Sequence, residues 1–364
     1  MRATIRKLLK TTGKSLGLSK LFWYFYRLLQ EFDPAYSPLD NKADKVFGFF
    51  TDSYGNRIEL LAGLRDRLKP GWQEMLRPAQ ASAPKSPRAC LANIKAWRDN
   101  LGRVDGFLRT FSLSFAEKEM LEIGAYDGAT AYALAEAGAK HVLATDMAAY
   151  YITQSPNGVV CEGAIATKNA DLARLRDAYS RSIDKQTAQR VSFLEDDICS
   201  SSLRSESVEA VMSWEVLEHL TRPEDAFRQI ARILKPGGFA FHEYNPFFSM
   251  NGGHSLCTLD FLWGHARLQA ADFEKYLEEI RPSEKSVALS FYRNNLNRMT
   301  LSELEHYVQQ SGLSLLSLLP QWMKNHLTLV RSESLSQCNR VYPSAELIDL
   351  ISPTVWVLLR KKDE

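Results

Sequence analysis

The sequence predicts an α/β fold in which a mainly parallel sheet is covered by helices. Two observations support this prediction. Short apolar runs alternate with helical patterns between residues 119 and 359, and the first of these runs ends in a glycine-containing turn. Strands that alternate with helices form a parallel sheet joined by crossover helices.

The predicted strands are short and rich in β-branched, leucine and aromatic residues, as strands buried in a sheet usually are. They cover Glu119 to Ile123, His141 to Thr145, Val191 to Leu194, Val208 to Ser213, Phe239 to Glu243, Leu313 to Leu318 and Thr354 to Leu359.

Capping signals place helices between these strands. Thr221 and Glu224 have the spacing of a capping box, and the helix that they begin is expected to end at residues 235–238, Lys-Pro-Gly-Gly. Thr300 and Glu303 repeat the capping box, and Gly312 follows as the expected terminator. Between the fifth strand and this second helix, residues 247–297 form a long insertion.

The region before the sheet is predicted to be helical. Residues 57–68 place apolar side chains on one helix face, and a second helical pattern runs from Cys90 to Leu108. Residues 77–88, rich in Pro, Ala and Ser, are the expected linker. The predicted organisation is therefore a basic arm at 1–32, a helical region at 33–110 and an α/β domain at 111–364.

The arm is basic and amphipathic. Seven Lys and Arg residues precede the first acid, Glu31, while Leu and Phe recur at helical spacing. Such a segment either packs its apolar face on the body or lies on an anionic membrane surface. A transit peptide is also basic and poor in acids, but the aromatic run at 21–26 fits one poorly.

Composition limits the class of protein. Of 364 residues, 45% are hydrophobic and 24% charged, which is typical of a globular protein and excludes wholesale disorder and collagen. The longest apolar run, 21–26, is far shorter than the roughly 18 residues of a bilayer span. Five scattered cysteines, an odd number, argue against a disulfide framework. We expect a cytoplasmic protein, with residues 1–32 as its contact if it is peripheral to a membrane.

Four motifs follow the predicted strands. The first strand leads into Glu122-Ile-Gly124-Ala-Tyr126-Asp-Gly128, a turn whose glycines allow close approach of a ligand to the backbone. Asp146 ends the second strand, where a carboxylate can accept hydrogen bonds from both ribose hydroxyls. Residues 195–198, Glu-Asp-Asp-Ile, follow the third strand, and 215–219, Glu-Val-Leu-Glu-His, follow the fourth.

In this order and spacing, the motifs from Glu119 to about Leu319 resemble those of class I S-adenosylmethionine-dependent methyltransferases. The resemblance implies a doubly wound, seven-stranded, Rossmann-like sheet with a reversed final hairpin, preceded here by the α-helical N-terminal extension. It also implies S-adenosylmethionine as the cofactor. Tyr126 departs from the pattern, because many members have glycine there.

The resemblance implies a role for each matching residue. Gly124, Ala125 and Gly128 would cradle the methionine and adenosine parts, and Asp146 would hold the ribose. Asp197 would bind the adenine amino group, with Ile198 packed on the adenine face. The remaining members of the predicted cofactor site are Glu122, Met147 and Glu215.

Methyl transfer needs alignment of nucleophile, methyl group and sulfur, and an alcohol acceptor must also lose its proton to a His, Asp or Glu. Ligands of open α/β sheets bind outside the carboxyl ends of the strands. The candidate catalytic residues are therefore His242, Glu243 and His254 at or after the fifth strand, together with His219 in the fourth motif. No tight metal-ligand spacing is present, so we expect no metal, and a metal-assisted variant that uses Asp or Glu with a histidine remains the alternative.

Residues 245–248, Asn-Pro-Phe-Phe, are similar to a base-gripping motif of nucleic-acid methyltransferases, but they follow the fifth strand instead of the fourth. The chain outside the arm also lacks a basic surplus, so we expect no nucleic-acid partner. The predicted function is O-methylation of a small molecule, a sugar or a lipid-linked glycan. Two alternatives remain: a nicotinamide-dependent dehydrogenase, and an inactive interaction protein that keeps the fold.

Overall fold

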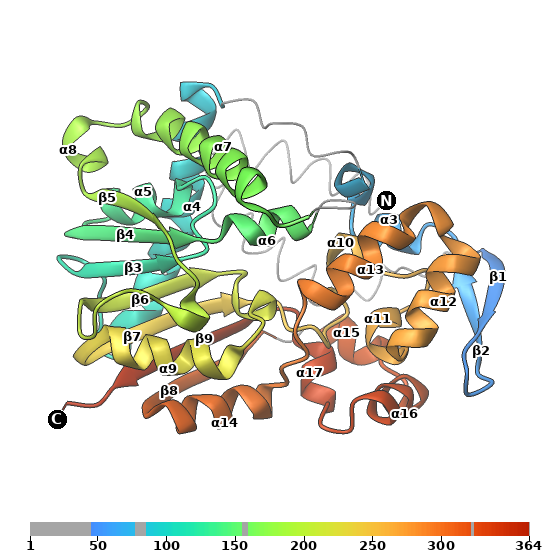
Figure 1. The fold of residues 1–364 in the computed structure, drawn as a ribbon. Helices are drawn as coiled ribbons and strands as arrows, with labels where there is room; N and C mark the ends of the chain where they lie inside the picture. Colours follow the sequence, from blue (N-terminus) through green and yellow to red (C-terminus); the bar gives the residue numbers. More distant parts are fainter. Residues whose placement is uncertain (1–44, 77–84, 155–158, 322–323, 364) are drawn as a thin grey trace, which may run out of the picture.

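The computed structural model describes residues 45–76, 85–154, 159–321 and 324–363, and it contains a seven-stranded sheet in the order β5-β4-β3-β6-β7-β9-β8 (Figure 1). β9 is antiparallel to both of its neighbours, and the other pairs are parallel. The seven predicted strands and the Rossmann-like fold class are confirmed. The strands are β3 Glu119–Ile123, β4 His141–Asp146, β5 Val191–Glu195, β6 Val208–Trp214, β7 Leu234–Tyr244, β8 Leu313–Pro320 and β9 Val355–Lys361.

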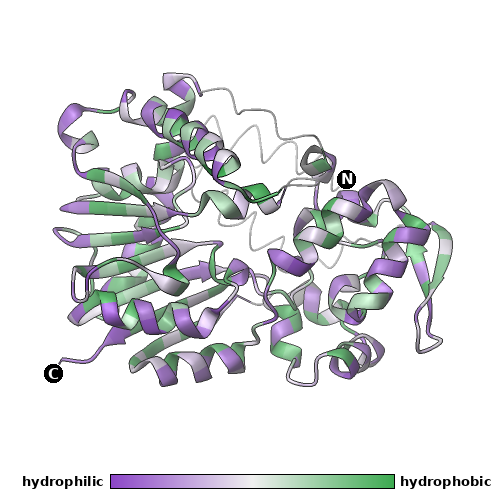
Figure 2. Cartoon of the chain, viewed as in Figure 1, coloured by the Kyte–Doolittle hydropathy of each residue, from purple (hydrophilic) through white to green (hydrophobic). Residues whose placement is uncertain are grey.

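Two hydrophobic cores lie on the two faces of the sheet. On one face, α4 Pro87–Arg109, α5 Ala129–Glu136 and Tyr179 of α7 Glu162–Ser180 pack on the strands. On the other face lie α9 Pro223–Ile233 and α14 Leu301–Ser311. Figure 2 shows long hydrophobic stretches along the strands, while α9 and α14 alternate between hydrophobic and hydrophilic residues. The sheet is therefore the middle layer of three.

Helix boundaries test the capping predictions. The capping box of Thr300 and Glu303 is confirmed, and Gly312 ends α14 in a left-handed conformation. The capping box predicted at Thr221 is wrong. α9 begins at Pro223 with Arg222 at the N-cap, because proline is favoured at the first helical position and sets the start of the helix.

The end of α9 and the start of α4 also differ from the predictions. α9 ends at Ile233 and residues 235–238, the predicted stop, already lie in β7. α4 begins at Pro87, within the stretch predicted as linker, and packs on the sheet. Residues 77–84 of that linker and the arm at 1–32 lie outside the described residues.

A second lobe stands beside the carboxyl ends of the parallel strands (right in Figure 1). It has its own hydrophobic core, formed by the insertion, the N-terminal hairpin and the segment before β9. Its elements are β1 Val46–Thr51, β2 Arg57–Leu61, α3 Leu64–Leu68, η2 Trp72–Leu76, α10 His254–Cys257, α11 Gly264–Arg267, α12 Ala270–Ile280, η5 Pro282–Glu284, α13 Lys285–Asn294, α15 Lys324–Leu329, α16 Ser332–Val341 and α17 Leu347–Ile351.

The helix predicted over residues 57–68 is wrong in its first half. Residues 57–61 form β2, which pairs with β1, and only Leu64–Leu68 is helical. Ile58 and Leu60 are buried while Arg57 and Glu59 are exposed, which is the alternation of a strand. A spacing of three residues between Ile58, Leu61 and Leu64 had the same appearance as a helix face.

A buried ion pair holds the N-terminal segment of the second lobe to the insertion. Arg65 of α3 donates to Glu284 at 2.6 Å, and both side chains are less than one-tenth exposed. Arg65 also donates to the carbonyl of Ser255 at 2.9 Å. Within the insertion itself, Arg281 and Asp260 form a further pair at 2.5 Å. These contacts fix the insertion next to His254.

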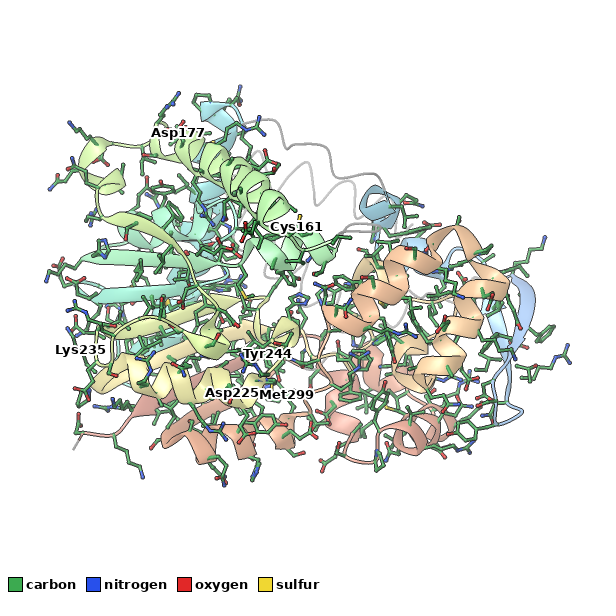
Figure 3. All side chains as sticks on the ribbon, viewed as in Figure 1. Cys161, Asp177, Asp225, Lys235, Tyr244 and Met299 are labelled. Atoms are coloured by element: carbon green, nitrogen blue, oxygen red, sulfur yellow. The ribbon has the colours of Figure 1, made fainter. Side chains whose placement is uncertain are left out.

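Figure 3 labels both ends of β7: Lys235 lies at the outer edge of the molecule, and Tyr244 lies at the end that faces the second lobe. The carboxyl ends of the parallel strands therefore point at the lobe. In the described parts of the chain, none of the helices is both long and apolar enough to cross a membrane. All five cysteines are free.

Candidate functional site

The glycine turn after β3 has a backbone that glycine alone adopts without strain. Gly124 and Gly128 have φ of 78° and 83°. A Cβ on Gly124 would lie 2.4 Å from Cγ2 of Val216, and one on Gly128 would lie 2.6 Å from Cζ of Phe193. Tyr126, at the departure from the family pattern, also has a positive φ, 42°, and its side chain is 40% exposed. The turn thus keeps its left-handed shape although one glycine is replaced.

Asp146 lies beside this turn at the end of β4. Its Oδ2 accepts from the backbone N–H of Tyr126 and, at 2.9 Å, from the hydroxyl of Tyr151, and its Oδ1 accepts from the N–H of Met147 at 2.7 Å. Arg176 lies 3.7 Å away. Burial raises the pKa of Asp146, although these hydrogen bonds oppose the shift. The role of Asp146 as the ribose ligand stays a prediction, in which a ribose hydroxyl would take the position of the Tyr151 hydroxyl.

Glu122, under the turn, is buried, and burial together with the charges of Asp146 and Asp127 raises its pKa to about 8. Among the described residues, its Oε2 has no hydrogen-bond partner. A buried oxygen without a partner is unfavourable, and a cationic amino group would satisfy it. Glu122, the two glycines and Asp146 therefore fit an amino-acid nucleoside such as the predicted cofactor.

The other predicted cofactor residues lie along the same edge. Ala125 is buried in the turn, and Met147 caps α6 Ala148–Thr153. Asp197 caps the short helix η3 Ile198–Ser200 through the N–H of Cys199, and Ile198 is buried. Glu215 follows β6 with φ of 55°, is exposed, and accepts from Asn245 at 3.2 Å.

In the segments that follow β6 and β7, the structure brings together two predicted histidines. His219 ends the short helix η4 Leu217–His219, and His254 begins α10. Their ring centroids are 4.8 Å apart, and Phe291 of α13 packs on both rings. Burial lowers the pKa of His219 to about 4 and that of His254 well below its usual value. Both imidazoles are therefore neutral, with nitrogen lone pairs free to accept.

Glu218 completes this cluster. It is fully buried, and burial is the main reason why its pKa is raised to about 8. One carboxylate oxygen, Oε1, accepts from the N–H of Asn245 at 3.1 Å. Glu218 lies within the predicted fourth motif, but only Glu215 and His219 of that motif are predicted site residues.

Two asparagines at the end of the insertion were not predicted. Asn295 accepts from Nδ1 of His219 at 2.5 Å through its backbone carbonyl, while its side chain donates to Thr153 at 2.9 Å. Asn297 donates to the carbonyls of Leu217 and Leu220 at 2.6 and 3.0 Å. The signal in the sequence is the pair of asparagines just before the capping box at Thr300, where buried amides commonly hold backbone.

His242 and Glu243, the other two predicted catalytic residues, have structural partners. His242 is fully buried within β7, bonds Ser213 Oγ at 2.7 Å and packs against Phe227 of α9. Glu243 points to the opposite face and accepts from Nε1 of Trp356 at 2.5 Å. The structure thus brings His219 and His254 together but holds His242 inside the sheet.

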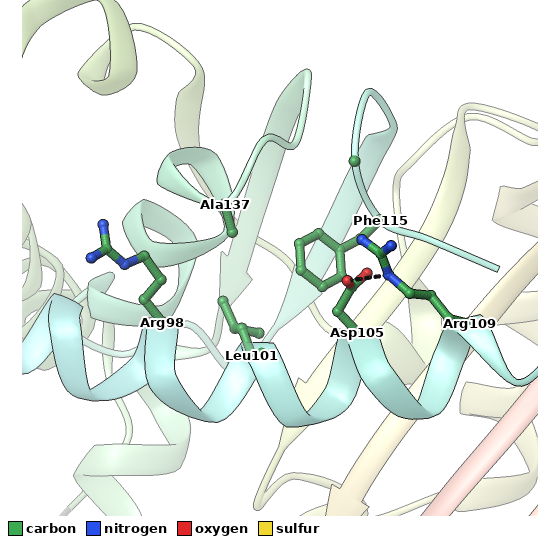
Figure 4. Close-up of a pocket in the computed structure, with 8 residues that line it drawn as sticks. Arg98, Leu101, Asp105, Arg109, Phe115 and Ala137 are labelled. Atoms are coloured by element: carbon green, nitrogen blue, oxygen red, sulfur yellow. Dashed lines mark hydrogen bonds and ion pairs between the residues drawn. The ribbon is translucent and has the colours of Figure 1, made fainter.

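A shallow hollow lies between α4 and the turn after α5, lined by Arg98, Leu101, Asp105 and Ala137 among others (Figure 4). It is near Phe115 and Ala116, just before β3 begins, whereas the glycine turn lies at the opposite end of that strand. The carboxylate of Asp105, which lines the hollow, is paired with Arg109 at 2.7 Å. This hollow is separate from the candidate site.

The chain is similar to solved methyltransferase structures. A Mesorhizobium loti S-adenosylmethionine-dependent methyltransferase is 14% identical, with a TM-score of 0.42, and the match covers 70% of this chain and 96% of that one. Haemonchus contortus phosphoethanolamine N-methyltransferase 2 is 16% identical, with a TM-score of 0.39, over 74% of this chain and 53% of that one. No curated protein matches the chain.

A family model described as "Methyltransferase domain" matches residues 95–318, which is more than half of the chain. The match begins within α4 and ends in β8, so it contains the glycine turn, Asp146 and the histidine cluster. The chain therefore belongs to the S-adenosylmethionine-dependent methyltransferases, and S-adenosylmethionine is its cofactor.

Proposed function

We propose that this methyltransferase methylates an oxygen atom of a small-molecule, sugar or lipid-linked acceptor that lies against His219 and His254. The observation that carries the proposal is the meeting of these two neutral imidazoles, 4.8 Å apart, at the carboxyl edge of the sheet. The carbonyl of Asn295 can only accept a hydrogen bond, so the proton of His219 is on Nδ1 and its Nε2 keeps a lone pair.

An alcohol is a weak nucleophile until its proton is lost, and a neutral imidazole at hydrogen-bond distance favours that loss. The cofactor supplies the methyl group on a sulfonium. The chain's contribution is to align the acceptor oxygen and to exclude water, and the second lobe supports this role because it covers the edge where both histidines lie. The family assignment does not favour a dehydrogenase or an inactive interaction protein.

The test is an acceptor panel of hydroxylated small molecules, sugars, lipid-linked sugars and matched amines, with products identified by mass spectrometry. Calorimetric binding of S-adenosylmethionine to the wild type and to Asp146→Ala verifies the cofactor site in parallel. We expect methyl ethers or esters, formed at a much reduced rate by His254→Asn and at an unchanged rate by His306→Asn, an exposed histidine on α14. Methylation of amines alone would overturn the proposal.

The basic arm supports a membrane-proximal acceptor within this proposal, through its pattern of Lys, Arg, Leu and Phe residues. We expect the full chain to float with anionic vesicles and a variant lacking residues 1–32 to remain in solution. Equal flotation of the two proteins, or none for the full chain, would remove the reason to favour lipid-linked acceptors.

A further inference from the structure

The cluster of Glu218, His219 and His254 has the composition of a metal site. Each residue offers one ligand atom, and these atoms all lie within 4.8 Å of one another. Two imidazole nitrogens and one carboxylate oxygen are a common donor set for divalent transition metals. The three residues come from two separate elements, η4 and α10, so this set arises only in the folded chain.

Two of the three residues have a potential ligand atom that no other group uses within the described structure. Oε2 of Glu218 and Nε2 of His254 are both buried and have no hydrogen-bond partner there. Glu218 as a whole is fully buried. Buried polar atoms in native proteins are nearly always bonded, so two orphans in one cluster indicate a missing partner.

The surroundings also orient the donors as a metal requires. The carbonyl of Asn295 holds the proton of His219 on Nδ1, so the lone pair of the ring is on Nε2 and is available to a metal. The N–H of Asn245 occupies Oε1 of Glu218 and leaves Oε2 free. These are the contacts with backbone groups that fix ligand orientation in metalloproteins.

The backbone before His254 is tightly packed. A Cβ on Gly252 would lie 2.1 Å from the carbonyl oxygen of Phe247, and one on Gly253 would lie 2.8 Å from Nδ1 of His265. His254 itself has φ of 49°. A left-handed non-glycine residue costs free energy and is typical of functional sites.

We propose that Glu218, His219 and His254 bind one divalent transition metal ion, such as Mn²⁺, Co²⁺ or Zn²⁺, whose open coordination positions take the acceptor oxygen. The charged groups around the cluster are Glu215 and Glu243, which act on Glu218, and Lys69, which acts on Glu218 and His254. Because the two carboxylates of Glu215 and Glu243 outnumber the one ammonium group of Lys69, the charge around the cluster favours binding of a cation. This site differs from the expectation of no metal drawn from the sequence.

The catalytic role of the ion rests on the proposed methylation of oxygen, but with the ion bound the imidazole lone pairs are held by the metal, so the ion replaces the imidazoles in promoting loss of the acceptor proton. A metal-bound hydroxyl loses its proton to solvent more readily, because the ion stabilises the resulting alkoxide. The alkoxide oxygen then forms its bond to the methyl carbon while the carbon–sulfur bond breaks, and the sulfur keeps the electron pair. The products are the methylated acceptor, S-adenosylhomocysteine and the released proton.

The experiment is a titration of the full chain, first freed of metal with a chelator, with Co²⁺ followed by its visible absorption. Zn²⁺ competition and elemental analysis give the stoichiometry. We expect about one equivalent per chain, with affinity at least tenfold weaker in Glu218→Gln, His219→Asn and His254→Asn. The matched control is His306→Asn, an exposed histidine outside the cluster, which should bind like the wild type.

Folding is checked separately, through the circular dichroism spectrum and through calorimetric binding of S-adenosylmethionine to His254→Asn. No Co²⁺ binding by the wild type, or equal binding by the folded cluster variants, would overturn the metal site. Oxygen methylation that continues in chelator would overturn the catalytic role of the ion and leave the proposed function intact. Metal bound at the cluster with only amines methylated would refute the proposed function and leave the site.

Discussion

The two sides of the site differ in how they are built. On the cofactor side, Asp146 is bonded by Met147, Tyr151 and the N–H of Tyr126, all within 20 residues of it in sequence. On the acceptor side, His219 meets His254 and the carbonyl of Asn295, which are far away in sequence.

The difference shows where the chemistry of the chain is encoded. A cofactor cradle made of consecutive strand ends and turns has a sequence signature that survives without knowledge of tertiary structure. An acceptor site assembled by an insertion has no such signature, because its residues meet only through the core of the second lobe. A substitution on one side should therefore leave the fold of the other side intact.

The largest effect is expected from Arg65→Ala, which breaks the acceptor side only. It leaves the buried carboxylate of Glu284 without its partner, which typically costs about 3–5 kcal/mol of stability. Chemical denaturation measures this loss. Arg228→Ala, which removes exposed ion pairs on α9, should cost about 1 kcal/mol or less. Equal losses in the two variants would mean that the Arg65 pair does not hold the lobe.

Glu122→Gln tests the cofactor side through pH. The pKa of Glu122 is raised to about 8 from an ordinary value of 4.5, so the folded protein binds this proton more tightly than the unfolded chain. The stability that this contributes is full below pH 4.5 and is lost as pH rises to about 8. Relative to the wild type, Glu122→Gln should therefore gain stability across that window, by up to roughly 5 kcal/mol.

Thermal or chemical unfolding at intervals from pH 4.5 to 9 measures this difference, and a constant offset at every pH would show that Glu122 does not titrate as described. Calorimetry adds a second readout. If Oε2 of Glu122 binds the amino group of the cofactor, the variant should also bind S-adenosylmethionine more weakly, although it is more stable at high pH.

Gly124→Ala should break the cofactor cradle. A side chain there is strained by the positive φ and collides with Val216, so we expect a loss of about 2–4 kcal/mol in stability and much weaker cofactor binding. Gly106→Ala is the matched control. Gly106 lies within α4 with no atom within 4 Å of its Cβ position, and alanine should stabilise that helix by about 0.5–1 kcal/mol. Wild-type cofactor affinity in Gly124→Ala would contradict the proposed cradle.

Tyr151→Phe should have the smallest effect and sharpens the comparison. The Tyr151 hydroxyl bonds the same Asp146 oxygen that a ribose would use, and its ring lies 5.3 Å from that of Tyr126. Removing this competitor should tighten S-adenosylmethionine binding by several-fold, about 1 kcal/mol, as measured by calorimetry. Weaker binding would show instead that Tyr151 stays with Asp146 when the cofactor is bound.

Much of the sheet could be predicted because its central strands are buried on both faces and therefore appear as short apolar runs. β3 was predicted to the residue, and the capping box at Thr300 was correct because its hydrogen bonds are local. The second lobe was harder. In residues 57–68, the alternation of Ile58 and Leu60 competes with a helical spacing, and only pairing with β1 decides between them.

The candidate site follows the same division. Gly124, Gly128 and Asp146 could be placed from their position after strands. His219 and His254 could be nominated, but their contact could not, since it depends on the fold of the insertion. The contact of Asn295 with His219 could not be predicted, because it is made by the backbone carbonyl and a carbonyl is present at every residue.

Asn295 has a consequence for the thermodynamics of the enzyme. Its side chain holds α6 through Thr153 and Tyr150, and its carbonyl holds His219, so one residue spans both ligand positions. α6 also carries Tyr151, the competitor for Asp146. Any free energy that the cofactor exerts on α6 therefore appears in the affinity for the acceptor, and linkage requires the acceptor to act on the cofactor by the same factor.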